Sequence, residues 1–562
     1  MTPKEHIGKE AIINNQNPLI VELNTETGFN DQTKQKIKAL KTFEITKATQ
    51  LQKDYLLPKV AKPKEINNVV EAMVKYLYAN YDFKTIVSEE TKELWVKIDH
   101  VYEPVAKAVI IAFTRDICGK KYKESLANQV MTRIYADNLI KSSNFFRGIT
   151  LDTVIVNNGV LNLKTRELTN DSTNQIHFNK HPIKYDKNAT CPNIEKFFKT
   201  ILEAENDVQT MYELIGYTLY KDSFIEKGVM FKGKTRNGKS KTLDLILNLL
   251  GNENISKVSL QRVVNDKTAL CMFQNKNANL CGDISGAPLK DVNQVKELIG
   301  RDNLTAFRKF KDDIGFKPYA KLIFSTNHLP ALEQNDTGFW TKWVLIDFPH
   351  TFISAEELLE KDKLLKDGKI TQSERNKYKL KDPFIINKLI TPEELSGLLN
   401  KALDGLDSIL KKNDFTKNQS AKTIERIWSR ESNSLVAFIE DNLENVSDSY
   451  ISPEDLRIKY KEYCDLNDKT EEYRSISKTM HTFGNSLCVG RRYSPDEPFG
   501  EKHSDIPIAK YWSNIKFKKE KKSIPSYQKA KGQSSFSATS NMSLSKPYTF
   551  EEETETGDSN EW

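Results

Sequence analysis

The residues best suited to chemistry lie in one short glycine-rich segment. Gly233 and Gly238 enclose four residues, and Lys239 and Ser240 follow directly, which gives the pattern G-x-x-x-x-G-K-S. Glycine lets a backbone wrap closely around an anion, so that successive N–H groups point at its oxygens. The lysine and the serine supply a cation for the terminal phosphates of a nucleotide and a hydroxyl ligand for Mg²⁺. The spacing therefore predicts a site for ATP and Mg²⁺ made by Gly233, Lys234, Thr235, Arg236, Asn237, Gly238, Lys239, Ser240 and Lys241.

The flanking residues predict the elements that such a loop needs. Residues 228–231 form a short apolar strand before it. The apolar residues after it repeat at the spacing of one helix face, which Gly251 closes: Leu243, Ile246, Leu247 and Leu250. A helix that starts at the loop turns its positive end toward phosphate. A chance match to the pattern is expected in roughly one chain of this length in a hundred, so the strand–loop–helix order favours the functional interpretation.

Two more polar residues follow apolar strands downstream. Residues 278–281 lead to Gly282 and Asp283, and residues 321–326 lead to Asn327. The carboxyl ends of parallel strands meet at one edge of a sheet, so both side chains are expected beside the loop. There Asp283 would hold the water shell of Mg²⁺, and Asn327 would orient the attacking water. Taken alone, Asp283 is more often a helix cap, but the loop upstream favours the metal role. For Asn327 a plain turn residue before Leu329-Pro330 is about as frequent as the catalytic role.

The composition of the 562 residues is typical of an intracellular protein with several domains. No apolar run approaches the roughly 18 residues of a membrane span, and the charged N-terminus is unlike a secretory signal. Six cysteines are scattered without a Cys-x-x-Cys pair, which argues against a disulfide framework and a zinc module and favours a reducing, cytoplasmic location. The net charge of +7 allows a nucleic-acid partner without establishing one.

Patterns along the chain divide it into six segments. Residues 64–200 are mainly helical, with a β-hairpin around Asn158-Gly159, whereas residues 201–350 alternate strand and helix signals and predict an α/β core with a mainly parallel sheet. Residues 429–516 have the order helix, capped helix, helix and basic strand pair of a winged helix, with a helix start at Ser452-Pro453. The other segments are a polar N-terminal arm (1–63), a helical extension and linker (351–428) and a disordered tail (517–562).

The order of these features resembles a known family. From about residue 154 to residue 348, and more loosely to residue 415, the chain resembles the superfamily III helicase module of phage, plasmid and poxvirus primase-helicases, as the helicase part without the primase domain. Besides the loop, the matching residues are Asn157-Asn158-Gly159-Val160-Leu161, Ile215-Gly216-Tyr217, Gly282-Asp283-Ile284-Ser285, Lys317-Pro318-Tyr319-Ala320-Lys321, Thr326-Asn327-His328-Leu329-Pro330, Phe339-Trp340, Phe348-Pro349, Glu394-Leu395-Ser396-Gly397-Leu398-Leu399-Asn400 and Leu403-Asp404-Gly405-Leu406.

The resemblance implies a P-loop NTPase core of the AAA+-like kind and an ATP-dependent DNA helicase that acts in the replication of a virus, phage, plasmid or other mobile element. It implies a homo-hexameric ring that hydrolyses ATP between subunits and pulls single-stranded or forked DNA through its centre. A separate primase or replication initiator would be a partner, and no membrane is involved.

The family also has a basic hairpin that enters the channel of the ring. Here it corresponds to residues 305–317, with a turn expected at residues 312–315 and DNA contacts expected from Arg308, Lys309, Lys311 and Lys317. The segment interleaves cations with aromatic residues, which suits phosphate contact and base stacking. Taken alone, such a segment is slightly more often a solvated edge hairpin that avoids aggregation. In the C-terminal segment, Arg491-Arg492 would contact DNA or form a solvated face.

The chain departs from the family pattern at two positions. The family often pairs two acids at the end of the second core strand, whereas Asp283 stands alone, with Glu297 or Asp302 as further candidates. The family places arginines after Phe-Trp, and one of them acts as a finger into the ATP site of the neighbouring subunit. Lys342 holds that place here, and lysine lacks the bidentate fork of arginine. Arg301 and Arg308 are the alternatives for this catalytic role.

Two other functions fit parts of the pattern. A P-loop ATPase with another task, such as a packaging motor or a signalling switch, would share the ATP site, but the basic hairpin and Phe339-Trp340 argue against it. A DNA-binding initiator with weak unwinding would accommodate Lys342 and the single Asp283. Strand displacement on forked DNA with ATP separates all three functions.

Overall fold

The computed structural model describes residues 65–88, 92–308, 311–333, 336–467, 469–471, 476–482, 487–491 and 508–518. The predicted N-terminal arm and nearly all of the predicted tail lie outside these residues. The chain forms two compact units. One runs to Asp441 and takes up Glu454–Gly484, and the other comprises Asn442–Pro453 and the chain from Asn485. Among the described helices, none is both long and apolar enough to cross a membrane.

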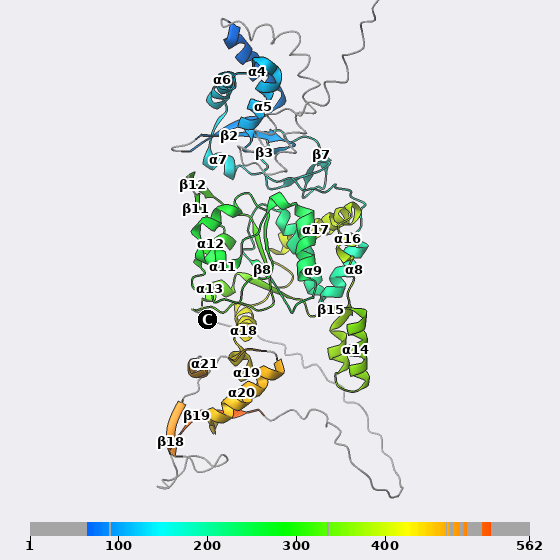
Figure 1. The fold of residues 1–562 in the computed structure, drawn as a ribbon, viewed down its shortest axis with the longest axis vertical. Helices are drawn as coiled ribbons and strands as arrows, with labels where there is room; N and C mark the ends of the chain where they lie inside the picture. Colours follow the sequence, from blue (N-terminus) through cyan, green and yellow to red (C-terminus); the bar gives the residue numbers. More distant parts are fainter. Residues whose placement is uncertain are drawn as a thin grey trace, which may run out of the picture. The chain divides into compact units, whose positions relative to one another are not determined.

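The first part of the larger unit contains a β-sheet that the sequence patterns did not reveal. Its four strands lie in the order β3-β2-β1-β4, and β1 pairs antiparallel with β2 but parallel with β4. In β1 and β2 buried residues follow one another instead of alternating, so no clear period of two appears and the helical pattern dominated the prediction. The elements (blue to cyan in Figure 1) are α4 (Ile66–Asn80), β1 (Phe83–Val87), β2 (Lys92–Ile98), β3 (Val101–Glu103), α5 (Ala106–Cys118), η3 (Gly119–Lys121), α6 (Glu124–Ala136), β4 (Leu139–Lys141) and α7 (Ser142–Arg147).

The predicted β-hairpin of this region is confirmed, but its turn lies one residue earlier. Strand β5 (Thr153–Val156) pairs with β6 (Gly159–Asn162), and Val156 lies opposite Gly159, so the two turn residues are Asn157 and Asn158. Gly159 belongs to the strand instead. A side chain there would overlap the carbonyl oxygen of Thr169 in β7 (Leu168–Thr169), which explains the glycine.

A five-stranded sheet forms the centre of the larger unit. All neighbouring strands pair in parallel, as the sequence predicts. The order is β14-β8-β13-β10-β9, so β8 has β13 on one side and β14 on the other. Because every strand points the same way, the carboxyl ends of all five meet at one edge. The strands are β8 (Gly228–Lys232), β9 (Ile255–Ser256), β10 (Ala278–Cys281), β13 (Lys321–Thr326) and β14 (Trp343–Asp347).

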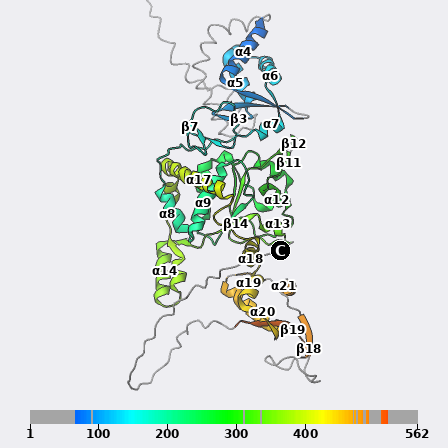
Figure 2. The same cartoon turned by 180° about the vertical axis from the view of Figure 1, so that it is seen from behind.

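Helices cover both faces of this sheet (Figures 1 and 2), and alternate strand residues enter two separate cores. In β8, Val229 and Phe231 enter one core whereas Met230 enters the other. The first core is built with α8 (Pro192–Ile201), α9 (Glu205–Leu219), α10 (Lys239–Leu250) and α17 (Pro392–Lys412). The second is built with α11 (Leu260–Asn265), η5 (Lys267–Phe273), α12 (Asn293–Ile299) and α13 (Thr337–Trp340). A short η4 (Asn252–Asn254) follows α10.

Glycines let α9 and α17 approach each other at backbone distance. A Cβ atom on Gly216 of α9 would overlap the carbonyl oxygen of Ala402, and one on Gly405 of α17 would overlap the backbone of Tyr212. Gly397 is crowded in the same way by the backbone of Thr190. These glycines belong to the family resemblance, and their physical role is close helix packing.

The basic hairpin consists of β11 (Leu304–Arg308) and β12 (Lys311–Phe316), which form a two-stranded antiparallel sheet. Arg308 lies opposite Lys311, and residues 312–315 lie within β12. The turn predicted at residues 312–315 is therefore wrong. Two aspartates followed by a glycine are typical of a turn, but here they lie within β12 because Gly315 pairs with Thr305.

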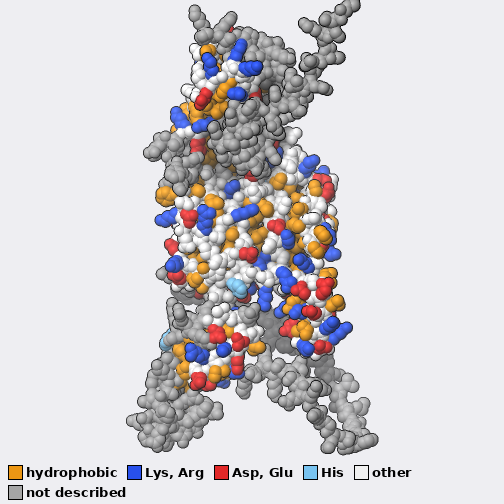
Figure 3. Space-filling model, in the orientation of Figure 1, with side chains coloured by type: hydrophobic (Ala, Val, Ile, Leu, Met, Phe, Trp, Pro, Cys, Tyr) orange, Lys and Arg blue, Asp and Glu red, His pale blue; other side chains and the backbone are white. Residues whose placement is uncertain are grey.

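A helical extension follows β14, as predicted. It contains β15 (Thr351–Ile353), α14 (Ala355–Lys366), α15 (Gln372–Asn376), β16 (Tyr378–Leu380) and α16 (Ile385–Leu389) before α17. Helix α14 buries none of its residues, and Figure 3 shows acidic and basic side chains closely mixed over its surface. Capping boxes at Ser354 and Thr371 fix the starts of α14 and α15.

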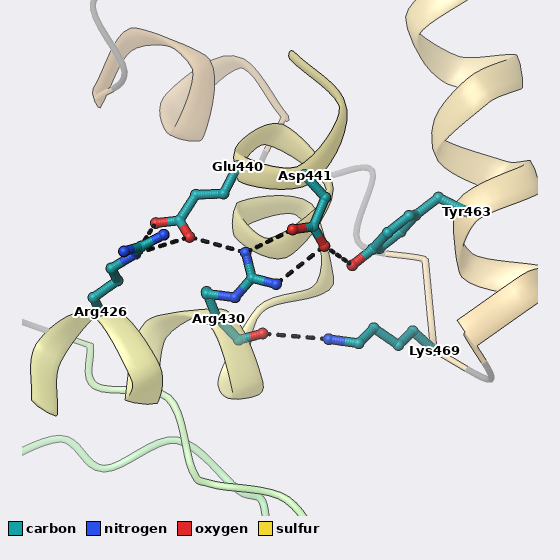
Figure 4. A network of polar contacts seen from close by, with 6 residues as sticks. All are labelled: Arg426, Arg430, Glu440, Asp441, Tyr463 and Lys469. Carbon is teal, nitrogen blue, oxygen red and sulfur yellow. Dashed lines mark hydrogen bonds and ion pairs between the residues drawn. The ribbon is translucent and has the colours of Figure 1, made fainter. Parts of the chain in front are cut away.

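The next helices are tied together by ion pairs (Figure 4). They are α18 (Ala421–Ser432), α19 (Ser434–Asn442) and α20 (Pro453–Asn467), followed by α21 (Ile476–Thr482). Arg430 of α18 contacts Glu440 and Asp441 of α19, and Tyr463 of α20 donates to Asp441 at 2.9 Å. Trp428 of α18 is fully buried in the second core of the sheet. These contacts make the three helices part of the larger unit.

The smaller unit contains a three-stranded antiparallel sheet. Its strands β17 (Leu443–Ile451), β18 (Leu487–Arg491) and β19 (Ile508–Phe517) lie in the order β17-β19-β18. The predicted domain 429–516 is thus divided between two units, and β17 was not predicted. The predicted helix start at Ser452-Pro453 is confirmed, because α20 begins at Pro453. Arg491 is the last residue of β18, and Arg492 lies outside the described residues.

Candidate nucleotide site

The 233–240 loop connects β8 to α10 at the carboxyl edge of the parallel sheet. Gly238 has φ 96, a left-handed conformation that favours glycine, and no side chain caps the start of α10. The first N–H groups of the helix therefore have no side-chain acceptor, and such groups bind anions well. Position 233 must be a glycine because the space around it is filled. A Cβ atom there would overlap Asn237 and the carbonyl oxygen of Phe348.

Lys239 is almost fully buried, and its ammonium is surrounded by oxygens of the loop and of β13. It donates to the carbonyl oxygens of Gly233 at 2.6 Å and Lys234 at 2.8 Å. It also donates to the side-chain oxygens of Asn237 and Asn327, both at 3.0 Å. Burial lowers the pKa of Lys239 to about 8, and the negative charge of Asp283 opposes this shift. The structure thus brings Lys239 and Asn327 together as the sequence predicts.

Asp283 and Ser240 lie at the open side of the same edge, and both are exposed. Asp283 follows β10 with φ 49, an uncommon conformation for a residue other than glycine. Nearby, the hydroxyl of Ser325 is buried and has no hydrogen-bond partner among the described residues. The described residues contain no group of three or more His, Cys, Asp or Glu side chains that could hold a metal. Mg²⁺ often binds one or two protein ligands together with substrate phosphates, and Ser240 and Asp283 fit that arrangement.

The remaining residues of the loop face outward or contact the chain that follows β14. Lys234, Thr235 and Lys241 are exposed. Arg236 has φ 57 and forms an ion pair at 3.0 Å with Glu357 of α14. Its carbonyl oxygen accepts from the N–H of Phe352 at 2.7 Å. Glu357 could not be found from the sequence, because this partner depends on how α14 packs and not on a local pattern.

Lys342 lies at the opposite end of the sheet from Lys239. It precedes β14, and its carbonyl oxygen accepts from the N–H of Gly228, the first residue of β8. Its ammonium forms a 2.6 Å ion pair with Glu226. Within one chain, Lys342 therefore makes no contact with the nucleotide site, and its predicted role toward a neighbouring subunit stays a prediction.

The candidate DNA-binding residues are not equivalent. Arg308 and Lys311 lie opposite each other in the hairpin, and Lys309 lies outside the described residues. Lys317 lies at the base of the hairpin instead, where it forms a 2.9 Å ion pair with Asp222. The alternative finger Arg301 contacts the same carboxylate at 2.7 Å. Asp222 was missed in the sequence because nothing near it suggests a function.

The fold and the site define an α/β protein with a parallel sheet and a polar site at the carboxyl ends of its strands. A family described as D5 N terminal like matches residues 20–203, and a family of unknown function (DUF5906) matches residues 231–338.

Two viral proteins named as predicted helicases are similar in sequence. One, from Acanthamoeba polyphaga mimivirus, is 25% identical over 39% of this chain and 24% of its own length. The other, from Sputnik virophage, is 22% identical over 80% of this chain and 53% of its own length. The chain thus spans between a quarter and about half of these relatives. A solved structure of the NrS-1 C-terminal region aligns with a TM-score of 0.34 at 12% identity, over 79% of this chain and 98% of that chain.

The D5-like match and the two viral relatives support the resemblance to phage and viral primase-helicases that the sequence motifs indicate.

Proposed function

We propose that this protein is an ATP-dependent DNA helicase that acts in the replication of a virus, phage, plasmid or other mobile element. The observation that carries the proposal is the buried ammonium of Lys239, held at 2.6 to 3.0 Å by the loop and by Asn327. A buried cation beside an uncapped helix start, on a glycine loop, is the arrangement that phosphate-binding loops use.

In this proposal the core is a P-loop NTPase and the 233–240 loop binds ATP. The phosphates replace the carbonyl oxygens now bonded to Lys239 and accept from the N–H groups of the loop. Ser240 and Asp283 hold Mg²⁺, which neutralises charge on the phosphates when it is bound. Asn327, already in contact with Lys239, orients the attacking water from the end of β13.

The hairpin formed by β11 and β12 is proposed to contact single-stranded DNA. Its register places Arg308 and Lys311 opposite each other at the far end of the paired strands, which we call the basic tip, whereas the predicted turn would have left both on one strand. A compact basic tip suits phosphate contact. In a homo-hexameric ring, one such tip from each subunit would contact the same strand.

The remaining parts of the proposal concern partners. Lys342 would complete the ATP site of a neighbouring subunit once it exchanges Glu226 for phosphate. The order helix, strand, helix, helix, strand, strand from α19 to β19 is that of a winged helix, which we propose as a second DNA-binding element. A separate primase or initiator would load the ring in the cytoplasm.

ATP hydrolysis by purified full-length protein tests the nucleotide site. Lys239→Ala should abolish hydrolysis, because among the described lysines Lys239 alone holds its ammonium buried against the oxygens of the loop, whereas Lys234 is exposed. Lys257→Ala is the matched control, since Lys257 is exposed and lies outside the site, and it should hydrolyse ATP at the wild-type rate. Normal hydrolysis by Lys239→Ala would refute the proposed nucleotide site.

A further inference from the structure

The base of the β11–β12 hairpin is held by a single carboxylate outside the nucleotide site. Asp222 lies three residues after α9. One of its oxygens, Oδ2, accepts from Arg301 at 2.7 Å, and the other, Oδ1, accepts from Lys317 at 2.9 Å. Arg301 precedes β11 and Lys317 follows β12. Asp222 therefore connects both ends of the hairpin to the same point of the core.

The carboxylate is sheltered although its two partners are not. The side chain of Asp222 is 13% exposed, against 50% for Arg301 and 41% for Lys317. Burial raises the pKa of Asp222, but the hydrogen bond and charge of Lys317, with the charge of Arg301, outweigh it and the pKa is lowered. A sheltered charge is screened less than an open one, so these ion pairs constrain the hairpin more than surface pairs do.

The backbone of Asp222 is fixed from the other side by a buried lysine. Lys321, the first residue of β13, donates to the carbonyl oxygens of Tyr220 at 2.8 Å, Asp222 at 3.0 Å and Tyr319 at 2.6 Å. Its ammonium lies over the ring of Tyr217, 4.3 Å from the centroid. The carboxylate of Asp222 is thus attached to the rigid core, and the hairpin is attached to the carboxylate.

Strand β13 links this region to the nucleotide site. It begins with Lys321, beside Asp222, and it is followed by Asn327, which accepts from Lys239. All six residues of β13 are buried between its neighbours β8 and β10. One short and fully packed strand therefore has the base of the hairpin at its amino end and Asn327 of the candidate nucleotide site at its carboxyl end.

We propose that Asp222 is a positioning residue that holds the hairpin so that its basic tip meets DNA, and that Lys317 acts through Asp222 instead of binding phosphate. This inference rests on the proposed function, because it takes the hairpin as the element that contacts DNA. It changes the expected role of Lys317, whereas Arg308, Lys309 and Lys311 keep theirs.

Electrostatics and anchoring predict opposite effects when Asp222 is neutralised. Asp222→Asn removes a negative charge near DNA and frees two cations, so charge alone predicts tighter binding. Loss of the anchor predicts weaker binding, because a loose hairpin must be ordered when DNA binds. The sign of the change therefore separates the two explanations.

The test is the affinity of full-length protein for a fluorescent single-stranded oligonucleotide over a series of salt concentrations. Asp222→Asn and Lys317→Met should each weaken binding by about 3- to 10-fold at every salt concentration, because hairpin order is lost and not a phosphate contact. The double variant should bind no more weakly than either single variant, since both changes break one interaction. Asp222→Glu should restore binding, and Asp222→Asn should keep the basal ATPase rate without DNA.

Lys311→Ala serves as the control for the hairpin itself. It should make the salt dependence shallower by about 0.7 in the log–log slope, as expected for one lost contact to a single strand. If Asp222→Asn loses its basal ATPase rate, the variant is taken as misfolded and Arg301→Met is used in its place. Arg301→Met should weaken DNA binding in the same way.

Three results would overturn the anchor. The first is tighter DNA binding by Asp222→Asn. The second is a shallower salt slope for Lys317→Met with an additive loss in the double variant, which would mean that Lys317 contacts phosphate. The third is unchanged binding by Asp222→Asn together with weaker binding by Lys311→Ala. If Asp222→Asn and Lys311→Ala both bind DNA as the wild type does, the hairpin does not contact DNA and that part of the proposed function is also wrong.

Discussion

Lys239, Asp283 and Asn327 could be placed from the sequence because each follows directly from a recognisable strand or loop. Parallel strands bring their carboxyl ends to one edge, so three residues far apart in the chain meet there. The partners of Lys342, Arg236 and Lys317 could not be predicted in this way. Glu226, Glu357 and Asp222 are ordinary surface-type residues in sequence, and only tertiary packing makes them partners.

The role of Asp283 can be tested by a change that keeps its size. Asp283→Asn removes the carboxylate charge that would hold the water shell of Mg²⁺, so nucleotide binding should persist while turnover falls about 100-fold or more. Binding of a fluorescent ATP analogue and steady-state ATPase rates measure the two effects separately. Turnover near the wild-type rate would assign the role to another acid, such as Glu297 or Asp302.

A buried lysine outside the site predicts how stability depends on pH. Among the described residues Lys221 has no carboxylate partner, and burial lowers its pKa to about 7. It donates to the carbonyl oxygens of Thr150 and Thr153 and contacts the ring of His177 at 3.1 Å. Burial, followed by the charge of Lys221, lowers the pKa of His177 to about 2, so this histidine stays neutral at ordinary pH.

The pKa of Lys221 in the folded chain lies below its value of about 10.4 in an unfolded chain. Between these two values the unfolded state binds more protons, so the free energy of unfolding should rise as pH increases from about 7 toward 10. Lys221→Met should reduce that slope by up to about 1.4 kcal/mol per pH unit. Urea denaturation at pH 7 and pH 9 measures it. An identical slope in the variant would mean that Lys221 is not neutral in the folded chain at pH 9.

At the scale of elements, strands β8, β10 and β13, helix α10 and the hairpin were predicted because hydrophobic period and length identify them. The N-terminal sheet and β17 were missed, since their strands carry no clear alternation. The prediction placed the turn of the basic hairpin at residues 312–315 because their residue types favour a turn. In the structure these residues lie in β12 instead, because the strands pair from Leu304 to Phe316. The crowded glycines of α9 and α17 show a packing constraint that sequence alone presents only as a resemblance.

The hairpin should carry most of the electrostatic attraction for DNA. Replacing Lys309 and Lys311 with alanine should weaken binding to single-stranded DNA and make its salt dependence shallower by about 0.7 per lost contact, because fewer counterions are released. Hydrolysis of ATP without DNA should survive in this double variant, since the hairpin holds no phosphate ligand. Wild-type unwinding by the double variant would contradict the channel role.

At the scale of the whole molecule, the hexameric ring and the ATP site shared between subunits remain proposals, because the structure holds a single chain. If Lys342 reaches a neighbouring site, Lys342→Ala should lose hydrolysis yet still bind DNA. Mixing it with Lys239→Ala should then restore part of the activity, because some interfaces carry both intact residues. Lys342→Arg should keep or raise the rate, since the arginine fork suits phosphate oxygens. No recovery at any mixing ratio would argue against a shared site.

The most direct test of the proposed activity is strand displacement from a forked DNA by full-length protein. We predict that the wild-type protein releases the labelled strand only with ATP and Mg²⁺, and that Lys239→Ala releases none while it still binds the fork. A wild-type protein that hydrolyses ATP but leaves the fork paired, or a Lys239→Ala variant that unwinds normally, would contradict the account.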